Sequence, residues 1–225
     1  MKKLVQGVHK FRSQAFEAKR ELFAGLARGQ QPHTLFITCS DSRINPSLLT
    51  QTDPGELFIL RNPGNLVPSN AAPYSGEAAG IEYALGALSI EHIVVCGHSH
   101  CGAMNALVSP AAGAQYPAMG AWLQHADATR RILSENYNSS PAEDQLNLAI
   151  QENVLVQLEN LRSYPMVAQR MDEGRLHLYG WVYKLETGEV FSFDVETGQF
   201  EAMGGKSETG ITATELPRIT TTLSL

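Results

Sequence analysis

Apolar residues recur at helical spacing through the first part of the chain, with charged residues between them. This spacing predicts an amphipathic helix over residues 4–28, which ends at the break "GQQP" at 29–32. Its apolar positions are Leu4, Val8, Phe11, Phe16, Leu22, Phe23 and Leu26. Because the helix comes before any predicted strand, its apolar face has no local partner, and we expect it to pack on a neighbouring subunit.

Three short apolar runs, at residues 34–38, 56–60 and 92–96, alternate with segments of helical spacing at 76–88 and 117–163. Strands that are almost continuously apolar are typical of a parallel sheet buried on both faces. We therefore predict an α/β fold with a central, mainly parallel β-sheet flanked by helices.

The pattern returns to strand over residues 176–194. The runs "LHLYGWVYKL" and "VFSFD" flank "ETGE", which is typical of an antiparallel hairpin. We predict one α/β domain over residues 1–201, in which 1–30 form an N-terminal helical arm, followed by a polar C-terminal tail over 202–225.

The long helical segment carries a start signal at residues 140–143, "SPAE". Serine at the N-cap, proline at the first helical position and glutamate at the third form a capping box. The pattern therefore predicts a helix that begins after Ser140.

The composition of the chain limits the cellular compartment and the kinds of binding partner that we expect for it. The 225 residues carry a net charge of −6 and no basic run, which argues against a nucleic-acid partner. No apolar run approaches the ~20 residues of a membrane span, and polar residues interrupt the first ten positions where a signal peptide needs an apolar core. Three cysteines make no disulfide framework, so we expect a cytoplasmic protein.

Cysteine and histidine residues follow two of the predicted strands at the point where each strand ends. Cys39 comes directly after the run at 34–38, and His98 and Cys101 come just after the run at 92–96. Ligand sites of open parallel sheets lie at the carboxyl ends of strands, and positions i and i+3 of a first helical turn share one face. Two sulfurs and one imidazole nitrogen suit zinc, and a fourth position left open is typical of catalytic zinc.

Other interpretations of these residues stay open on the pattern alone. A lone cysteine is most often a small buried hydrophobe, and Cys96, inside an apolar run, fits that role. His100 is a rival ligand, although it falls on a different side of the turn from His98. A redox dithiol site would need C-x-x-C, and a zinc nucleobase deaminase would need H-x-E with P-C-x-x-C, and neither pattern occurs.

Asp41 and Arg43 follow Cys39 at alternate positions. A surface ion pair is the plain interpretation of this spacing, and such pairs contribute little to stability. Beside a zinc ion the pair acquires a role, because a free carboxylate so close to Cys39 could become the fourth ligand. Arg43 can hold Asp41 away with a bidentate hydrogen bond, which leaves Asp41 to accept a hydrogen bond from a zinc-bound hydroxide.

Two motifs taken together, "CSDSR" at 39–43 and "GHSHCG" at 97–102, resemble β-class carbonic anhydrase. Further stretches resemble the same family in order and spacing: "GELFILRNPGN" at 55–65, "EYAL" at 82–85, "ENV" at 152–154 and "LHLYGWVY" at 176–183. The resemblance covers residues 1–200 and is strongest toward the bacterial and cyanobacterial branch, which includes carboxysomal and cyanase-associated enzymes.

The resemblance implies an enzyme that hydrates CO₂ reversibly to bicarbonate and a proton by attack of a zinc-bound hydroxide. It implies one Zn²⁺ per chain, held by three ligands: Cys39, His98 and Cys101. It also implies that Asp41 and Arg43 form the catalytic pair beside the metal.

The same motif alignment implies a substrate pocket. Gln30 matches the family glutamine that hydrogen-bonds substrate, and Phe58 and Tyr83 match apolar pocket residues that are supplied across a dimer interface. The expected active unit is therefore a dimer, assembled further into a larger homo-oligomer. Pro63 departs from the pattern, because many members carry alanine or another small apolar residue there, and the shape of the pocket wall is an open point.

Two other functions fit the same zinc ligands. Hydrolysis of carbon disulfide or carbonyl sulfide would use the same centre and depend on access to the pocket. A zinc-binding scaffold protein without turnover is the other, and it has no need of Asp41 and Arg43. The resemblance is compatible with two locations. One is inside a carboxysome, with shell or scaffold proteins as partners, and the other is free in the cytoplasm.

Overall fold

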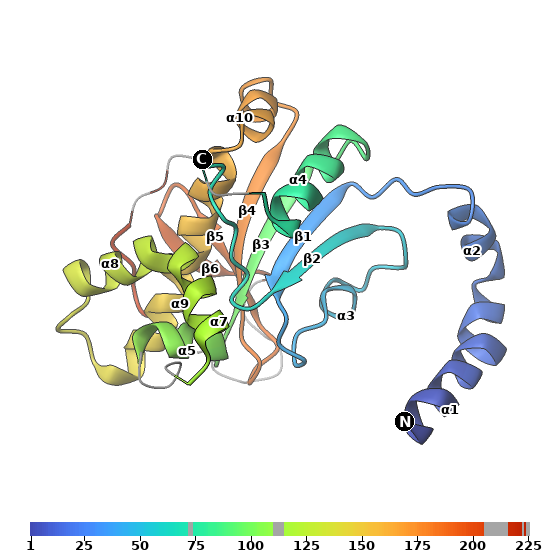
Figure 1. Cartoon of the computed structure of the whole chain (residues 1–225), viewed down its shortest axis with the longest axis horizontal. Helices are drawn as coiled ribbons and strands as arrows, with labels where there is room; N and C mark the ends of the chain where they lie inside the picture. The colour runs from blue at the N-terminus through green and yellow to red at the C-terminus, as the bar shows by residue number, and fades with distance from the viewer. Residues whose placement is uncertain (72–73, 110–114, 205–215, 222, 224–225) are drawn as a thin grey trace.

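Six β-strands form one sheet in the order β2-β1-β3-β4-β5-β6, and helices lie against it (Figure 1). The computed structural model describes residues 1–71, 74–109, 115–204, 216–221 and 223. The strands are β1 (Thr34–Cys39), β2 (Leu57–Asn62), β3 (His92–His98), β4 (His177–Tyr183), β5 (Val190–Asp194) and β6 (Gln199–Ala202). The described helices are α1 (Lys2–Lys10), the π-helix η1 (Phe11–Phe16), α2 (Arg20–Leu26), α3 (Pro46–Thr50), α4 (Gly76–Gly86), α5 (Gly102–Val108), α7 (Pro117–Trp122), the 3₁₀-helix η2 (Leu123–Ala126), α8 (Asp127–Asn136), α9 (Ala142–Arg162) and α10 (Pro165–Asp172). None of them combines the length and the apolar composition that a membrane crossing requires.

The predicted mainly parallel sheet is confirmed. Strands β2, β1, β3 and β4 run parallel to one another, and β5 and β6 continue the sheet in antiparallel pairing. The predicted hairpin is the β4–β5 pair. The last strand, β6, was not predicted, because only Phe200 of its four residues is buried and so short an edge strand shows no alternating pattern.

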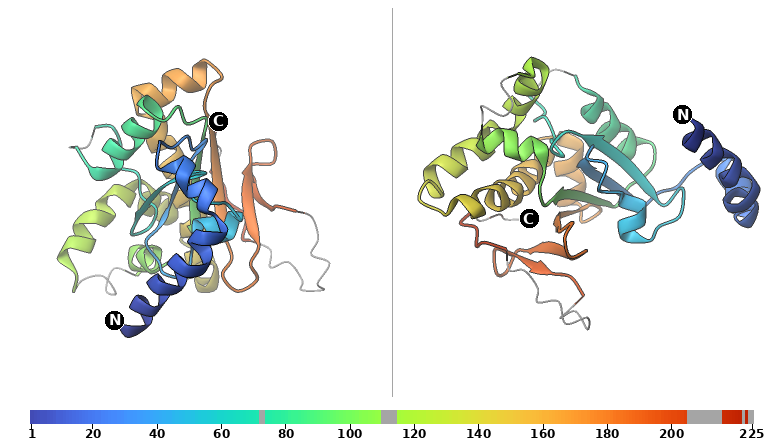
Figure 2. Two further views of the ribbon diagram at one scale, coloured as in Figure 1. Left: turned by 90° about the vertical axis from the view of Figure 1, so that its right-hand side faces the viewer. Right: turned by 90° about the horizontal axis from the view of Figure 1, so that it is seen from below.

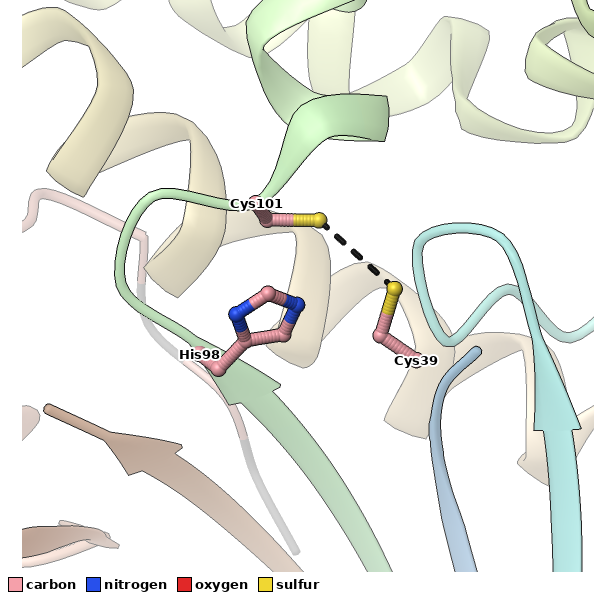
Figure 3. A group of neighbouring side chains, drawn as sticks. All are labelled: Cys39, His98 and Cys101. Carbon is pink, nitrogen blue, oxygen red and sulfur yellow. Dashed lines mark hydrogen bonds between the residues drawn. The ribbon is translucent and has the colours of Figure 1, made fainter. Parts of the chain in front are cut away.

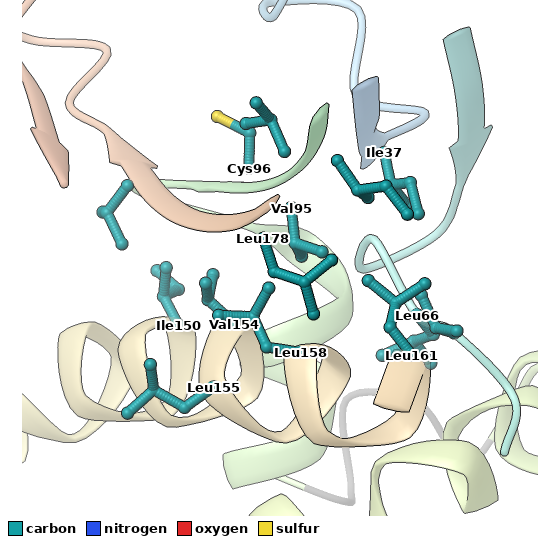
Figure 4. Packing of buried hydrophobic residues seen from close by; sticks show 14 of the residues in the cluster. Ile37, Leu66, Val95, Cys96, Ile150, Val154, Leu155, Leu158, Leu161 and Leu178 are labelled. Carbon is teal, nitrogen blue, oxygen red and sulfur yellow. The ribbon is translucent and has the colours of Figure 1, made fainter. Parts of the chain in front are cut away.

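Helix α9 supplies much of the core on one face of the sheet. Its side chains Ile150, Val154 and Leu158 are buried, and they point toward the strands that carry Val95 and Leu178 (Figure 4). Burying a side chain of this size stabilises the fold by about 1.5–3 kcal/mol relative to leaving it exposed. This packing fixes α9 relative to β3 and β4.

Two glycines let α9 approach the sheet closely. A Cβ atom at Gly97 would lie 3.0 Å from methyl groups of both Ile150 and Val154, and one at Gly180 would lie 2.9 Å from Val154 Cγ1. Both glycines sit on strands, where a missing side chain commonly marks the close approach of another element.

The N-terminal arm extends away from the sheet, as Figure 1 and the right-hand view of Figure 2 show. The predicted single helix is wrong in its continuity, because the chain leaves helical geometry at Lys19, with φ −119° and ψ 27°. No residue of α1 is buried, and Leu4, Val8 and Phe11 are 66%, 66% and 48% exposed. The apolar face predicted from the sequence therefore lacks cover from the described part of its own chain.

The predicted capping box does not form. Helix α9 starts at Ala142, its N-cap residue is Pro141, and no side chain caps it. Pro141 has ψ 142°, an extended value, so Ser140 stands one residue too far out to cap the first turn. Instead, the side chain of Gln145 reaches back and donates to the carbonyls of Tyr137 and Ser140.

Two apolar residues of the last segment, which is polar in composition, are buried. Ile219 and Leu223 are buried in the core. Gln199 of β6 holds Ile219 through two hydrogen bonds to its backbone, of 2.9 and 3.0 Å, and the Thr220 N–H donates to the Tyr137 hydroxyl at 2.6 Å. Two apolar residues within the segment expected to be a polar tail therefore pack against the core.

We expect alanine substitutions at two glycines to change stability in opposite directions. Gly180→Ala should lose about 1–3 kcal/mol, because the new methyl group meets the stiff, branched side chain of Val154. Gly86→Ala should gain about 0.4–1 kcal/mol, because nothing lies within 4 Å of the new atom and the unfolded chain loses freedom. Urea denaturation of both variants measures the two effects, and equal destabilisation would contradict the packing argument.

Candidate metal centre

The three predicted metal ligands come from elements that the sheet topology brings together (Figure 3). Cys39 ends β1, His98 ends β3, and Cys101 is the N-cap residue of α5. Because β1 and β3 are parallel neighbours, their carboxyl ends meet at one edge of the sheet. One ligand atom from each residue lies within 4.8 Å of the other two, and all three residues are at most 5% exposed.

The imidazole of His98 is held in the tautomer that a metal needs. Its Nδ1 lies 2.9 Å from the carbonyl oxygen of Ser99, which can only accept, so Nδ1 carries the proton. The lone pair on Nε2 is buried and has no hydrogen-bond partner among the described atoms. An unpaired buried group of this kind costs about 1–3 kcal/mol. One ring nitrogen faces the two sulfurs in Figure 3, where a bound cation would satisfy it.

The two sulfurs also fit a metal. They lie 3.9 Å apart, and two thiolates each about 2.3 Å from a tetrahedral zinc ion would be about 3.8 Å apart. The hydrogen bond from Cys101 is the main cause that lowers the pKa of Cys39 to about 4, against the effect of burial. The same bond, together with burial, raises the pKa of Cys101. A divalent cation between the sulfurs would replace the proton that they share, and two sulfurs with one nitrogen suit zinc.

Asp41 is held beside this group by Arg43. The Arg43 side chain donates from Nε to Asp41 Oδ1 at 2.9 Å and from Nη2 to Oδ2 at 2.7 Å, and it also reaches the carbonyl of His100 at 3.0 Å. This bidentate pairing keeps the pKa of Asp41 well below its usual range, so Asp41 is an acceptor throughout the neutral range. Its Oδ2 lies 4.0 Å from His98 Nε2, which places the carboxylate next to the ligand atoms.

Arg61 braces the loop that carries Cys39 and Asp41, a role that sequence reasoning did not assign to it. Its guanidinium donates to the backbone carbonyls of Cys39, Asp41 and Ile44 at distances between 2.7 and 3.0 Å. The one available signal was a charged residue directly after the apolar run at 56–60. The brace fixes the backbone between the proposed ligand and the carboxylate.

A second polar cluster, also missed by sequence reasoning, supports the end of β3. The Ser99 hydroxyl donates to Glu186 at 2.6 Å and accepts from the Leu185 N–H at 2.9 Å. Burial acts to raise the pKa of Glu186, but the hydrogen bonds from Ser99 and from the nearly buried Lys184 prevail and lower it to about 2. The cluster ties the residue after His98 to the turn that follows β4.

The predicted pocket residues lie away from the metal ligands of their own chain. Phe58 and Tyr83 contact each other, with ring centroids 5.9 Å apart. Phe58 stands four residues before Asn62, the partner of Cys39 in the β1–β2 register, which places it about 13 Å along the strand from Cys39. Gln30 precedes β1, whose opposite end carries Cys39. The structure therefore does not gather these three residues around the metal group of their own chain.

The rival ligand His100 and the core residue Cys96 both lie outside the metal group. His100 is exposed, and its Nε2 lies 3.6 Å from a carboxylate oxygen of Glu186. Cys96 is fully buried, and Figure 4 shows its side chain on the face of the sheet away from α9. Burial raises the pKa of the Cys96 thiol, which suits the expected role as a core residue.

Comparison with known proteins identifies relatives over most of the chain. Residues 34–190 match the family model described as "Carbonic anhydrase". A carbonic anhydrase of Synechococcus elongatus is 50% identical over 191 residues, which is 84% of this chain and 70% of the relative. One of Pseudomonas aeruginosa is 44% identical over 92% of this chain and 94% of its own length.

Solved structures agree with these relatives. The β-carbonic anhydrase CcaA superposes with a TM-score of 0.88 at 46% identity, covering 90% of this chain and 98% of the other. One of two tetrameric β-carbonic anhydrases from Sordaria macrospora superposes with a TM-score of 0.75 at 27% identity, covering 84% and 94%. The described sheet, with its antiparallel C-terminal strands, is thus shared with structures of this class.

We expect the purified protein to hold one zinc ion per chain with two sulfur neighbours and one nitrogen neighbour. Cys39→Ala should lose the metal yet keep its helical circular dichroism, because the core is built by the sheet and α9 and does not depend on the centre. Cys96→Ala is the matched control and should keep a full complement of zinc. Metal analysis with X-ray absorption tests this, and a first shell of oxygen and nitrogen alone would contradict the ligand assignment.

Proposed function

Because the chain belongs to the β-class carbonic anhydrase family, a family of zinc enzymes, we propose that it hydrates CO₂ reversibly to bicarbonate and a proton at the Cys39–His98–Cys101 group. One observation carries this proposal above the others. The buried Nε2 of His98 has no hydrogen-bond partner among the described atoms, and the sulfurs of Cys39 and Cys101 lie 3.9 Å apart. Beside them, the carboxylate of Asp41 is already held by Arg43.

Cys39, His98 and Cys101 are the residues that would hold the metal. When bound there, Zn²⁺ supplies a Lewis acid that lowers the pKa of water from ~15.7 to about 7 and so makes a nucleophile available near neutral pH. The Ser99 carbonyl already holds a proton on His98 Nδ1, which leaves Nε2 as the ring nitrogen available to the metal. The centre therefore needs little rearrangement to accept its ion.

Asp41 orients the attacking water. Its carboxylate lies 4.0 Å from His98 Nε2 and, being ionised, accepts a hydrogen bond from an O–H of that water. Arg43 has a different task. By occupying both carboxylate oxygens it keeps Asp41 from turning toward the metal ligands and taking the fourth position.

The substrate pocket is proposed to form between two copies of the chain. Phe58 and Tyr83 offer a dry, apolar slot suited to CO₂, and Gln30 offers one polar anchor. Because Phe58 lies about 13 Å along the strand from its own Cys39, these side chains can serve the metal of a partner far better than their own. The tetrameric assembly of the Sordaria macrospora relatives supports a homo-oligomer.

We expect Arg43→Ala to lose at least a hundredfold in CO₂ hydration while it keeps its zinc, because Asp41 is then free to turn onto the metal. Asp41→Asn should lose activity to a similar degree, because the amide can present a donor to the attacking water. Stopped-flow hydration of CO₂ beside metal analysis tests both variants, with wild-type protein as the reference.

Carbon disulfide and carbonyl sulfide serve as competing substrates in the same assay. Faster turnover of either one than of CO₂ would replace the proposed reaction with the alternative hydrolysis. Zinc without any turnover in the wild-type chain would indicate a scaffold protein. Full activity in Arg43→Ala would remove the role given to the Asp41–Arg43 pair.

We expect the active unit to be at least a dimer that the N-terminal arm holds together. Val8→Glu places a charge on the exposed apolar face of α1 and should shift the protein toward smaller species and lower activity. Gln6→Glu adds the same charge on the opposite side of the helix and should change neither. Sedimentation velocity with parallel activity measurements tests this, and a fully active monomer would refute it.

A further inference from the structure

The loop after β2 passes beside the metal centre, and one of its peptide N–H groups contacts a ligand sulfur. Gly64 N lies 3.4 Å from Cys39 Sγ, as in an N–H···S hydrogen bond. We propose that Trp122 and Asn153 are positioning residues that aim the Gly64 N–H at Cys39 and thereby set how tightly the centre holds its metal. This inference rests on the proposed function, because it takes Cys39 as a zinc ligand.

The loop has a conformation that needs outside support. Gly64 and Asn65 both have left-handed backbone angles, with φ of 82° and 49°. Such values in a residue other than glycine are uncommon, and the surrounding structure must hold them in place. Space is also short, because a Cβ atom at Gly64 would lie 3.1 Å from both Ala103 Cβ and Met104 Cε.

Trp122 anchors the peptide group that carries the N–H in question. Its indole Nε1–H donates to the Pro63 carbonyl oxygen at 2.8 Å. The Pro63 carbonyl and the Gly64 N–H belong to one planar trans peptide, so they point in opposite directions. A tryptophan that fixes the oxygen therefore also fixes the direction of the N–H.

Asn153 anchors the next peptide group along the loop. Its Nδ2 donates to the Gly64 carbonyl at 3.0 Å, while its Oδ1 accepts from Gln157 Nε2 at 2.9 Å. The Gln157 Oε1 in turn accepts from the Val67 N–H at 2.8 Å, and a backbone N–H can only donate. Each amide is thus held in one orientation, and Asn153 and Gln157 are both fully buried on α9.

An N–H donor matters at this sulfur because the thiolate is the form that binds metal. A hydrogen bond from a backbone N–H stabilises the negative charge of a thiolate, and the Gly64 N–H lies within hydrogen-bond distance of the Cys39 sulfur. Some residues orient a metal ligand without binding the metal themselves. Removing such a residue typically weakens metal binding by about 10–100-fold.

The chain provides matched controls for both residues. Asn160, also on α9, donates to the Val67 carbonyl of the same loop at 2.9 Å, three residues beyond the peptide that faces Cys39. Trp181, the other tryptophan, packs edge-to-face on Phe36 within the sheet, with ring centroids 5.8 Å apart. Substitution of either one removes a comparable group without touching the Gly64 peptide.

The experiment compares Trp122→Phe and Asn153→Leu with Trp181→Phe and Asn160→Leu in the full-length protein. Zinc affinity is measured by competition with a chelator, and the sulfur-to-cobalt absorption band is recorded after substitution with Co²⁺. Thermal midpoints report the loss of stability in all four. We expect the two test variants to bind zinc about tenfold more weakly and to shift the cobalt band, and the controls to differ less than threefold from wild type.

Several results would overturn the inference. Test and control variants that weaken zinc binding equally, in step with their thermal midpoints, would mean that Trp122 and Asn153 only stabilise the fold. Unchanged zinc affinity in both test variants would exclude the inference and leave the proposed function intact. A wild-type chain that binds no zinc through sulfur would instead remove the proposed function itself. Trp122→Phe keeps an aromatic ring in place, so it remains informative even where Asn153→Leu fails to fold.

Discussion

The parallel pairing of β1 with β3 is the constraint on which the rest of the centre depends. The register that joins Thr34 to His92 and Thr38 to Cys96 brings the ends of both strands level, and those ends carry Cys39 and His98. A slip of one residue would turn every apolar side chain of the strand to the other face. The packing of the sheet that specifies this register therefore also brings together the strand ends that carry Cys39 and His98.

Polar side chains then hold the loops of this frame in place. Arg61 holds the loop after β1, Ser99 with Glu186 holds the end of β3, and the α9 amides hold the loop after β2. A buried polar group is costly unless it is hydrogen-bonded, and Ser99, Asn153 and Gln157, which are buried, each have hydrogen-bond partners. The loops around the metal ligands are thus fixed by side chains that come from distant parts of the chain.

The sequence predicted what depends on local patterns. Continuous apolar runs identified β1, β2 and β3, and residues placed directly after them identified Cys39 and His98. It failed where contacts outside the local pattern decide: Ser140 is displaced from its cap by the extended Pro141, and Ile219 is buried at a place where Gln199 of β6 bonds its backbone. The supporting role of Trp122 had no local signal, because its partner carbonyl at Pro63 lies far away in the sequence.

The composition of the donor set has an electrostatic consequence. A divalent cation with two thiolates and a neutral imidazole carries no net charge, and the Asp41–Arg43 pair beside it also sums to zero. A neutral centre can be buried without the desolvation penalty of an isolated charge. It also exerts no long-range pull on ions, which suits the two sides of the reaction. Under the proposed function, uncharged CO₂ would gain nothing from electrostatic steering, and bicarbonate would leave a site with no surplus positive charge to retain it.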